Sequence, residues 1–134
     1  MPAPLALNER PGAIGVLTVD DQAIFRAAAR DVIDATPGFE SVGEVASGAE
    51  ALAASDGLRP DLALIDVRMP GMDGIETTRR LRAARPETVI VLVSLEDAVE
   101  IGPAAQRCGA VTFVRKQELC PDVLARVWAT HGRR

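Results

Sequence analysis

The amino-acid sequence predicts an α/β domain in which helices cover both faces of a five-stranded parallel sheet. Short apolar runs without polar alternation recur along the chain, and such runs are typical of strands buried on both faces. Amphipathic segments separate these runs, so that strand and helix alternate five times. The chain has 134 residues, of which 48% are hydrophobic, and this suits one domain with a single core.

The predicted strands are rich in β-branched and aliphatic residues. They span residues 14–19, 39–46, 62–66, 88–94 and 111–114. Right-handed crossovers place the connecting helices on both faces of such a sheet. The natural arrangement is therefore a flavodoxin-like (βα)5 fold, a doubly wound parallel sheet with strand order 2-1-3-4-5. Aromatic residues make up only 3% of the chain, so the core must be largely aliphatic.

Five helices are expected between and after these strands. They span residues 23–35, 49–58, 74–85, 99–108 and 121–130. The apolar face of the first helix is predicted to hold Ile24, Ala27, Ala28, Val32 and Ile33.

The fourth helix carries a local conflict at Gly102-Pro103. Proline inside a helix removes a hydrogen bond and clashes with the preceding turn. We therefore expect this helix to begin late, near Pro103, after a long mobile loop that starts at Ser94.

Composition limits the classes of function. The formal net charge is −4 with mixed signs, so no basic surface for nucleic acid is expected. No apolar run approaches the length of a membrane span. Cys108 and Cys120 have no motif spacing and are expected to be buried or half-buried thiols in a reducing compartment. We expect a cytoplasmic domain over residues 13–131, a loose leader over residues 1–12, and a tail or linker over residues 132–134.

Polar residues follow the predicted strands at their carboxyl ends. Asp20 and Asp21 follow the first strand, Asp66 ends the third, Ser94 ends the fourth, and Lys116 follows the fifth. Ligands of open α/β sheets bind beyond these strand ends, so the five side chains are expected to meet at one rim.

Three carboxylates at one rim repel one another unless a cation lies between them. Oxygen ligands favour Mg²⁺, or Mn²⁺, over zinc. With a metal bound, one carboxylate stays ionised and attacks phosphorus, while Lys116 and the metal neutralise the transferring group. Each residue alone has a plainer interpretation. Asp20-Asp21 and Ser94 suit helix caps, Asp66 suits a turn, and Lys116 suits a solvated charge.

The chain resembles the receiver domains of two-component response regulators. The resemblance covers residues 14–128, and its most specific part is the segment LIDVRMPGMDG at residues 64–74. The segment around Gly109 to Leu124 resembles the NarL/FixJ subclass, whose members carry LuxR-type DNA-binding domains.

This resemblance implies a role for each residue at the rim. Asp66 is the implied phosphoacceptor, and Asp21, Asp66 and the backbone carbonyl of Arg68 are the implied direct Mg²⁺ ligands, with Asp20 nearby. Lys116 and Ser94 are implied to bind the phosphoryl group. Phe113 stands at the position of an aromatic switch residue that moves inward with Ser94.

Other positions are implied to tune this chemistry. Arg68 and Glu96 stand where the family sets the lifetime of the phosphorylated form, and they are expected either to pair across the mouth of the site or to be solvated separately. Leu95 replaces a usually small residue, so we expect it to narrow access to Asp66. Gln117 stands where many members have proline after a cis bond. Gly71 and Gly74 are expected to permit the tight loop beside Asp66.

The resemblance also implies partners. It predicts a phosphorylation-dependent switch that takes its phosphoryl group from a sensor histidine kinase and is not otherwise an enzyme. The switch changes the surface formed by the expected helix at residues 99–108, the strand at 111–114 and the helix at 121–130. A homodimer is expected through that surface or through the helices at residues 23–35 and 121–130. We expect this switch to control transcription. DNA would then be bound only by an output domain outside this chain. The chain is either a stand-alone receiver or part of a longer regulator.

The sequence leaves two other functions to compare with this one. An aspartate-nucleophile phosphatase needs a second aspartate two residues after the nucleophile, where this chain has Arg68. A pseudo-receiver, acting as a phosphorylation-independent binding module, would lack an essential acidic residue or the lysine, and none is missing here.

Overall fold

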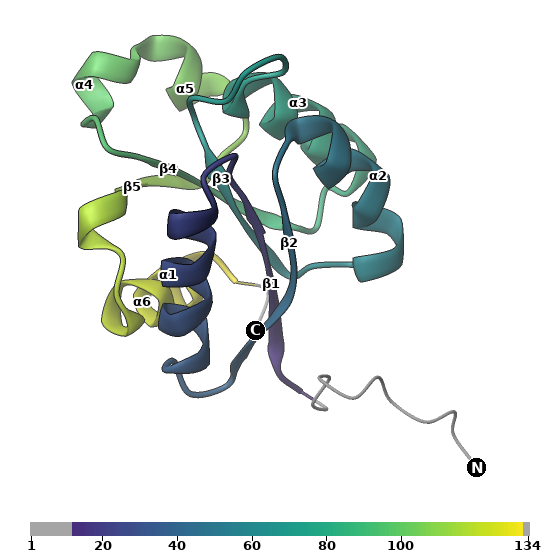
Figure 1. The fold of residues 1–134 in the computed structure, drawn as a ribbon, viewed down its shortest axis with the longest axis vertical. Helices are drawn as coiled ribbons and strands as arrows, with labels where there is room; N and C mark the ends of the chain where they lie inside the picture. Colours follow the sequence, from purple (N-terminus) through teal and green to yellow (C-terminus); the bar gives the residue numbers. More distant parts are fainter. Residues whose placement is uncertain (1–11, 133–134) are drawn as a thin grey trace.

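The computed structural model describes residues 12–132. The predicted leader therefore lies outside the described residues except for Gly12, and so do residues 133 and 134 of the predicted tail. Five strands form one parallel sheet in the order β2-β1-β3-β4-β5 (Figure 1), which confirms the predicted fold class and strand order.

The elements have boundaries close to those predicted. The strands are β1 (Ile14–Val19), β2 (Phe39–Val45), β3 (Leu62–Asp66), β4 (Val89–Ser94) and β5 (Thr112–Arg115). The helices are α1 (Ala23–Asp34), α2 (Gly48–Leu58), α3 (Gly74–Ala84), α4 (Ala98–Ile101), α5 (Pro103–Arg107), the short 3₁₀ helix η1 (Lys116–Glu118) and α6 (Pro121–His131).

The sheet separates two hydrophobic clusters. Successive residues of a strand point to opposite faces, so β3 sends Leu62 and Leu64 to one cluster and Ala63 and Ile65 to the other. Helices α1 and α6 cover the first cluster, and α2, α3 and α5 cover the second (Figure 1). The strands are therefore buried on both faces, which explains their lack of polar alternation.

The predicted apolar face of α1 is confirmed at Val32 and Ile33 and wrong at its N-terminal half. Ile24 is 87% exposed, and Ala27 and Ala28 are also exposed. The face that packs on the sheet holds Phe25, Ala29, Val32 and Ile33. Both sets have helical spacing, and they differ in the first two turns, where Phe25 and Ala29 pack in place of Ile24 and Ala28, each one residue further along the helix. Only packing against the sheet selects one of them.

The predicted break at Gly102 is present, but the predicted loop before it is only partly correct. Gly102 adopts φ 93°, and α5 begins at Pro103, where a missing N–H costs no helical hydrogen bond. Residues Ala98–Ile101, however, form a helical turn of their own instead of a continuous loop. Pro103 and Gly102 interrupt the helix only where they stand. The residues before them, Ala98–Ile101, can therefore still form a helical turn.

Two further expectations concern the rest of the described chain. Cys108 is buried, Cys120 is half-buried, and both thiols are free, as predicted. Among residues 12–132, no helix combines the length and apolar composition that a membrane crossing requires.

Candidate phosphoryl-acceptor site

Asp20 and Asp21 follow β1 directly, at the carboxyl edge of the sheet. The side chain of Asp20 is fully buried, and its Oδ1 accepts a hydrogen bond from the backbone N–H of Gln22 at 2.8 Å. Asp21 is exposed. Asp20 therefore stabilises the turn before α1. The plainer interpretation of Asp20-Asp21 as the helix cap is wrong, because the N-cap is Gln22 and its side chain makes no capping bond.

Asp66 is the last residue of β3 and is only 4% exposed. The loop after it folds back tightly, and the Gly74 N–H donates to the carbonyl of Val67 at 2.9 Å. A Cβ added at Gly74 would lie 2.0 Å from the Asp66 carbonyl oxygen. Gly71 adopts φ 75°, in the left-handed region that glycine allows. The two glycines thus let the loop pack closely against the backbone of Asp66, as predicted.

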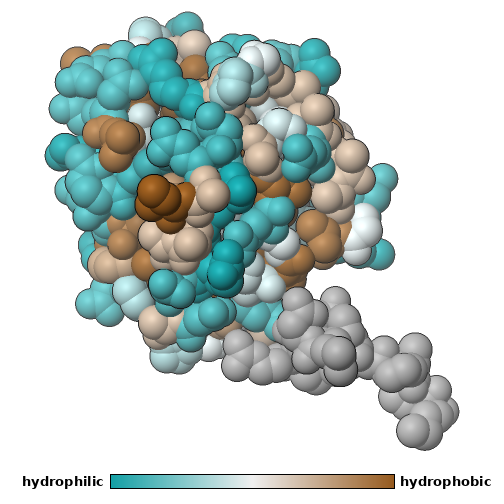
Figure 2. Space-filling model, in the orientation of Figure 1, coloured by the Kyte–Doolittle hydropathy of each residue, from teal (hydrophilic) through white to brown (hydrophobic). Residues whose placement is uncertain are grey.

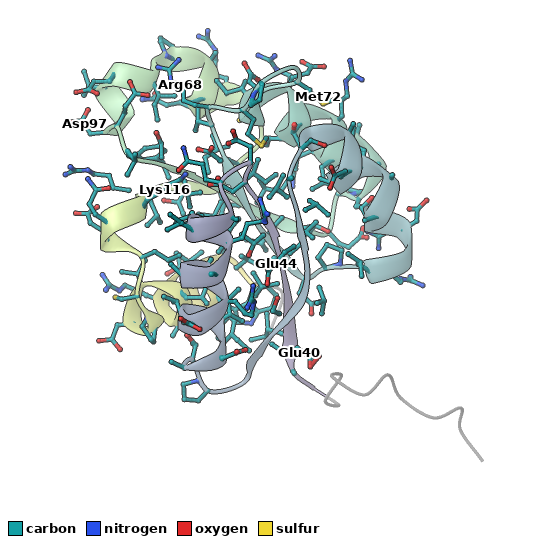
Figure 3. The ribbon with its side chains drawn as sticks, viewed as in Figure 1. Glu40, Glu44, Arg68, Met72, Asp97 and Lys116 are labelled. Carbon is teal, nitrogen blue, oxygen red and sulfur yellow. The ribbon has the colours of Figure 1, made fainter. Side chains whose placement is uncertain are left out.

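Lys116 follows β5 and brings an ammonium group to the same carboxylates. Its Nζ lies 2.6 Å from Asp20 Oδ2 and 3.6 Å from Asp66 Oδ1. The side chain is 8% exposed, so this charge is paired away from water. Figure 3 shows Lys116 beside the first turn of α1. The structure therefore brings together Asp20, Asp66 and Lys116, which are far apart in the sequence.

The three carboxylates fit a divalent cation. Asp20, Asp21 and Asp66 each offer one oxygen, and these oxygens lie within 4.8 Å of one another. Two of the three residues are buried and one is exposed, so a cation would be held at the edge of the protein with an open side. An all-oxygen donor set of this kind suits Mg²⁺ or Mn²⁺.

The environment of Asp66 favours its protonated form when no metal is present. Burial and the charge of Asp20 raise the pKa of Asp66 to about 6, against an ordinary value of 3.8. Lys116 and the backbone N–H of Arg68 act in the opposite direction and lower this pKa. A cation beside Asp66 would add to their effect, because positive charge favours the ionised carboxylate.

Ser94 ends β4 beside Asp66. β3 and β4 pair Asp66 with Val93, the residue before Ser94. The Ser94 side chain is buried, and its Oγ accepts the Glu96 N–H at 3.1 Å. Since α4 begins only at Ala98, Ser94 caps a turn and is not the N-cap of that helix. Its hydroxyl hydrogen remains available for an acceptor.

Phe113 lies in β5 and is half-buried. It lines a pocket of about 200 Å³ together with Leu92, Ile101 and Ala105. The pocket is bounded by the helical turns on either side of Gly102, so Phe113 has open space next to it on the α4–α5 side of the sheet.

Arg68 and Glu96 pair across the mouth of the site. The guanidinium of Arg68 donates from Nε to Glu96 Oε1 at 2.6 Å and from Nη2 to Oε2 at 3.2 Å. The Arg68 guanidinium lowers the pKa of the Glu96 carboxyl. Of the two arrangements that the sequence left open, the structure has the ion pair.

Two departures from the family pattern also lie at this mouth. Leu95 is 64% exposed and lines a surface groove with Ile24, Phe25 and Lys116. Figure 2 shows an apolar patch over the start of α1, where this groove lies. Gln117 lies in η1, and the described residues contain no cis peptide bond.

Sequence reasoning missed one residue of the site. The ring of Phe25, in the first turn of α1, lies under the Lys116 ammonium, with 4.6 Å between Nζ and the ring centroid. A sequence signal was present, because Phe25 is the sole aromatic residue of that helix and comes one turn after Asp21. The wrong helical face assigned to α1 obscured it.

Comparison with known proteins agrees with this geometry. A family model for the response regulator receiver domain matches residues 16–127. A candidate transcriptional regulator of Pseudomonas aeruginosa is 35% identical over 109 residues, which cover 81% of this chain and 52% of that protein. A protein-glutamate methylesterase/protein-glutamine glutaminase of Thermotoga maritima is 34% identical over 124 residues, covering 85% of this chain and 36% of that protein. The chain thus spans about half or less of these relatives.

Solved structures give the same result. The signal receiver domain of the candidate response regulator NarL from Mycobacterium tuberculosis has a TM-score of 0.82 and 31% identity, covering 92% of this chain and all of that one. The response regulator domain of Thermotoga maritima CheB has a TM-score of 0.74 and 31% identity, covering 87% of this chain and 95% of that one.

Proposed function

Because the chain belongs to the receiver-domain family of response regulators, we propose that it accepts a phosphoryl group on Asp66 and thereby changes the surface it presents to a partner. The observation that carries this proposal is the arrangement around Asp66: a buried carboxylate, two further carboxylates and a paired ammonium at one rim. Such a set holds an anionic group and stabilises charge that develops on it.

The chemistry assigned to these residues is phosphoryl transfer. An oxygen of Asp66 attacks phosphorus and forms a P–O bond, while the P–N bond to the imidazole of the donor histidine breaks and its electrons stay on the nitrogen. Lys116 neutralises the oxygens of the transferring group, and the Ser94 hydroxyl donates to one of them afterwards. A divalent cation held by Asp21, Asp66 and the Arg68 carbonyl, with Asp20 nearby, would supply further positive charge.

The readout is proposed to pass through β5. The pocket beside Phe113 gives the ring room to move inward when Ser94 shifts toward a phosphorylated Asp66, and the outer surface of α4, α5, β5 and α6 then changes. This surface, or α1 with α6, is the proposed homodimer contact.

The proposed partners follow from the family. A sensor histidine kinase is the phosphodonor, and the setting is cytoplasmic. The Pseudomonas relative and the NarL receiver structure favour control of transcription through an output domain outside this chain. The methylesterase relatives are matched over only about a third of their length, so we propose that this domain itself catalyses only its own phosphorylation.

The test is intact mass measurement after incubation with Mg²⁺ and acetyl phosphate. We expect a gain of one phosphoryl group in the wild type and in Asp97→Asn, a control for loss of an exposed carboxylate near the rim. Asp66→Asn should show no gain. If the folded wild type gains no mass with acetyl phosphate or phosphoramidate, the pseudo-receiver function replaces this proposal.

A further inference from the structure

The ammonium of Lys116 has three electron-rich neighbours. Asp20 Oδ2 lies 2.6 Å and Asp66 Oδ1 3.6 Å from Nζ, and the centroid of the Phe25 ring lies 4.6 Å away. An ammonium carries three N–H donors and no acceptor, so it needs partners on several sides when it is buried. The face of an aromatic ring within about 6 Å attracts a cation. The ring therefore supplies a third attractive neighbour for the ammonium of Lys116, whose side chain is 8% exposed.

The ring is held by a part of the fold that is well fixed. Phe25 packs against the cluster under α1, and Ala29 and Ile33 of the same helix are fully buried there. The side chain of Arg26 also links α1 to the residues before it, because its guanidinium donates to the Asp20 backbone carbonyl at 2.7 Å. Phe25 is thus a platform whose position does not depend on the charges at the rim.

The carboxylates and the ring differ in what they do during the proposed reaction. Asp20 and Asp66 are the groups that a divalent cation would engage, which weakens their hold on the Lys116 ammonium. The ring is uncharged, so it does not bind the cation in their place and its attraction for the ammonium persists. Of the three neighbours, only Phe25 keeps the same relation to Lys116 throughout.

We propose that Phe25 is a positioning residue for phosphoryl transfer: its ring holds the Lys116 ammonium beside Asp66 through a cation–π contact. This inference rests on the proposed phosphorylation of Asp66. It predicts that weakening the ring's negative face slows transfer from a small donor, even when the size and apolar character of the side chain are kept.

A spectroscopic test addresses the contact itself. The ring current should shift protons of the Lys116 side chain near the ring upfield, and this shift should disappear in Phe25→Leu while it persists in Phe25→Trp. Phe39→Leu is the matched control, because Phe39 begins β2 at the opposite end of the sheet. Lys116 resonances that do not change in Phe25→Leu would overturn the proposal.

A kinetic test addresses the role. Phe25 is replaced by 3,4,5-trifluorophenylalanine, which keeps the ring's shape and reduces its attraction for cations, and phosphorylation by acetyl phosphate is followed with saturating Mg²⁺. We expect the rate to fall roughly three- to tenfold, with the same replacement at Phe39 having no effect. In a Lys116→Met background the fluorinated ring should cause no further loss, because the two residues act as one unit.

The outcomes distinguish the proposed role of Phe25 from the proposed phosphorylation of Asp66. If the wild type takes up no phosphoryl group, the function proposed for Asp66 fails, and the ring-current shift still reports whether Phe25 and Lys116 touch. If the wild type is phosphorylated and the fluorinated protein reacts at the same rate, Phe25 only fills space. A loss of equal size in the Lys116→Met background would likewise exclude action through Lys116.

Discussion

The Arg68 guanidinium forms a two-point ion pair with the Glu96 carboxylate, and the two residues follow Asp66 and Ser94 by the same two positions. The pair joins the loop after β3 to the loop after β4, directly over the mouth of the site. Its side chains are 64% and 35% exposed, so it contributes little to stability, in line with surface ion pairs generally. Because it joins the loops that follow Asp66 and Ser94, we expect it to hinder the approach of water to Asp66.

Loss of this pair is expected to shorten the lifetime of phosphorylated Asp66. Glu96→Gln and Arg68→Gln should each speed the loss of the phosphoryl group severalfold, because water reaches the acyl phosphate more easily. Each should leave the free energy of unfolding nearly unchanged, because exposed ion pairs contribute little to stability. Time-resolved intact mass measures the first and urea denaturation the second.

The double variant distinguishes pairing from separate effects. If the pair is the barrier, Arg68→Gln combined with Glu96→Gln should dephosphorylate no faster than either single variant. The Arg68 carbonyl, the proposed metal ligand, is retained in all three proteins. Rates that multiply would show that the two charges act independently.

Removal of the Asp66 charge is expected to stabilise the metal-free protein. The pKa of Asp66 is raised to about 6, so the folded state binds the proton more tightly than the unfolded state does. The stability associated with this proton is fully present below about pH 4 and is lost as the pH rises through about 6. At pH 7, Asp66→Asn should therefore be more stable than the wild type by about 1–3 kcal/mol.

This difference should depend on pH and on metal. Urea denaturation in the presence of a chelator should show the gap closing as the pH falls from 7 to 4. Added Mg²⁺ should stabilise the wild type and leave Asp66→Asn nearly unchanged. A wild type that is the more stable protein at pH 7 without metal would contradict the assigned environment of Asp66.

A side chain at Gly74 is expected to disrupt the loop behind Asp66. The added Cβ would meet the Asp66 carbonyl oxygen at 2.0 Å and the Val67 Cα at 2.8 Å, both backbone atoms that move only with the strand. Gly74→Ala should thus cost about 2–3 kcal/mol of unfolding free energy, as overpacking does elsewhere. Gly57→Ala is the control, since Gly57 lies in α2 with open space around its Cβ position. In Gly57→Ala, the free energy of unfolding should rise by about 0.5–1 kcal/mol, and thermal denaturation measures both variants.

A smaller residue at position 95 is expected to open the site. Leu95 borders the groove that contains Lys116, so Leu95→Ala should accelerate both phosphorylation by acetyl phosphate and subsequent hydrolysis. Its exposure of 64% predicts a change in stability below about 0.5 kcal/mol. Val99→Ala, which shortens another exposed side chain, should alter neither rate. Unchanged rates in Leu95→Ala would show that this leucine does not limit access.

The sequence by itself determined the fold class, the strand order and which residues reach the rim. Apolar runs of strand length could only be buried in a covered parallel sheet, and the carboxyl ends of parallel strands share one edge. Asp20, Asp66, Ser94 and Lys116 could therefore be placed together without coordinates. The break at Gly102 was also predictable, because the constraint on proline is local.

Only the tertiary structure decided how these residues touch. The packed face of α1 was misassigned because two sets of apolar residues had helical spacing, and contact with the sheet selects between them. That choice places Phe25 under Lys116. The pairing of Arg68 with Glu96 and the raised pKa of Asp66 likewise depend on distances and burial between chain-distant groups. The periodicity of apolar residues is local and specifies helices and strands. The contacts between those helices and strands depend on how they pack in three dimensions, and a local sequence pattern does not specify that packing.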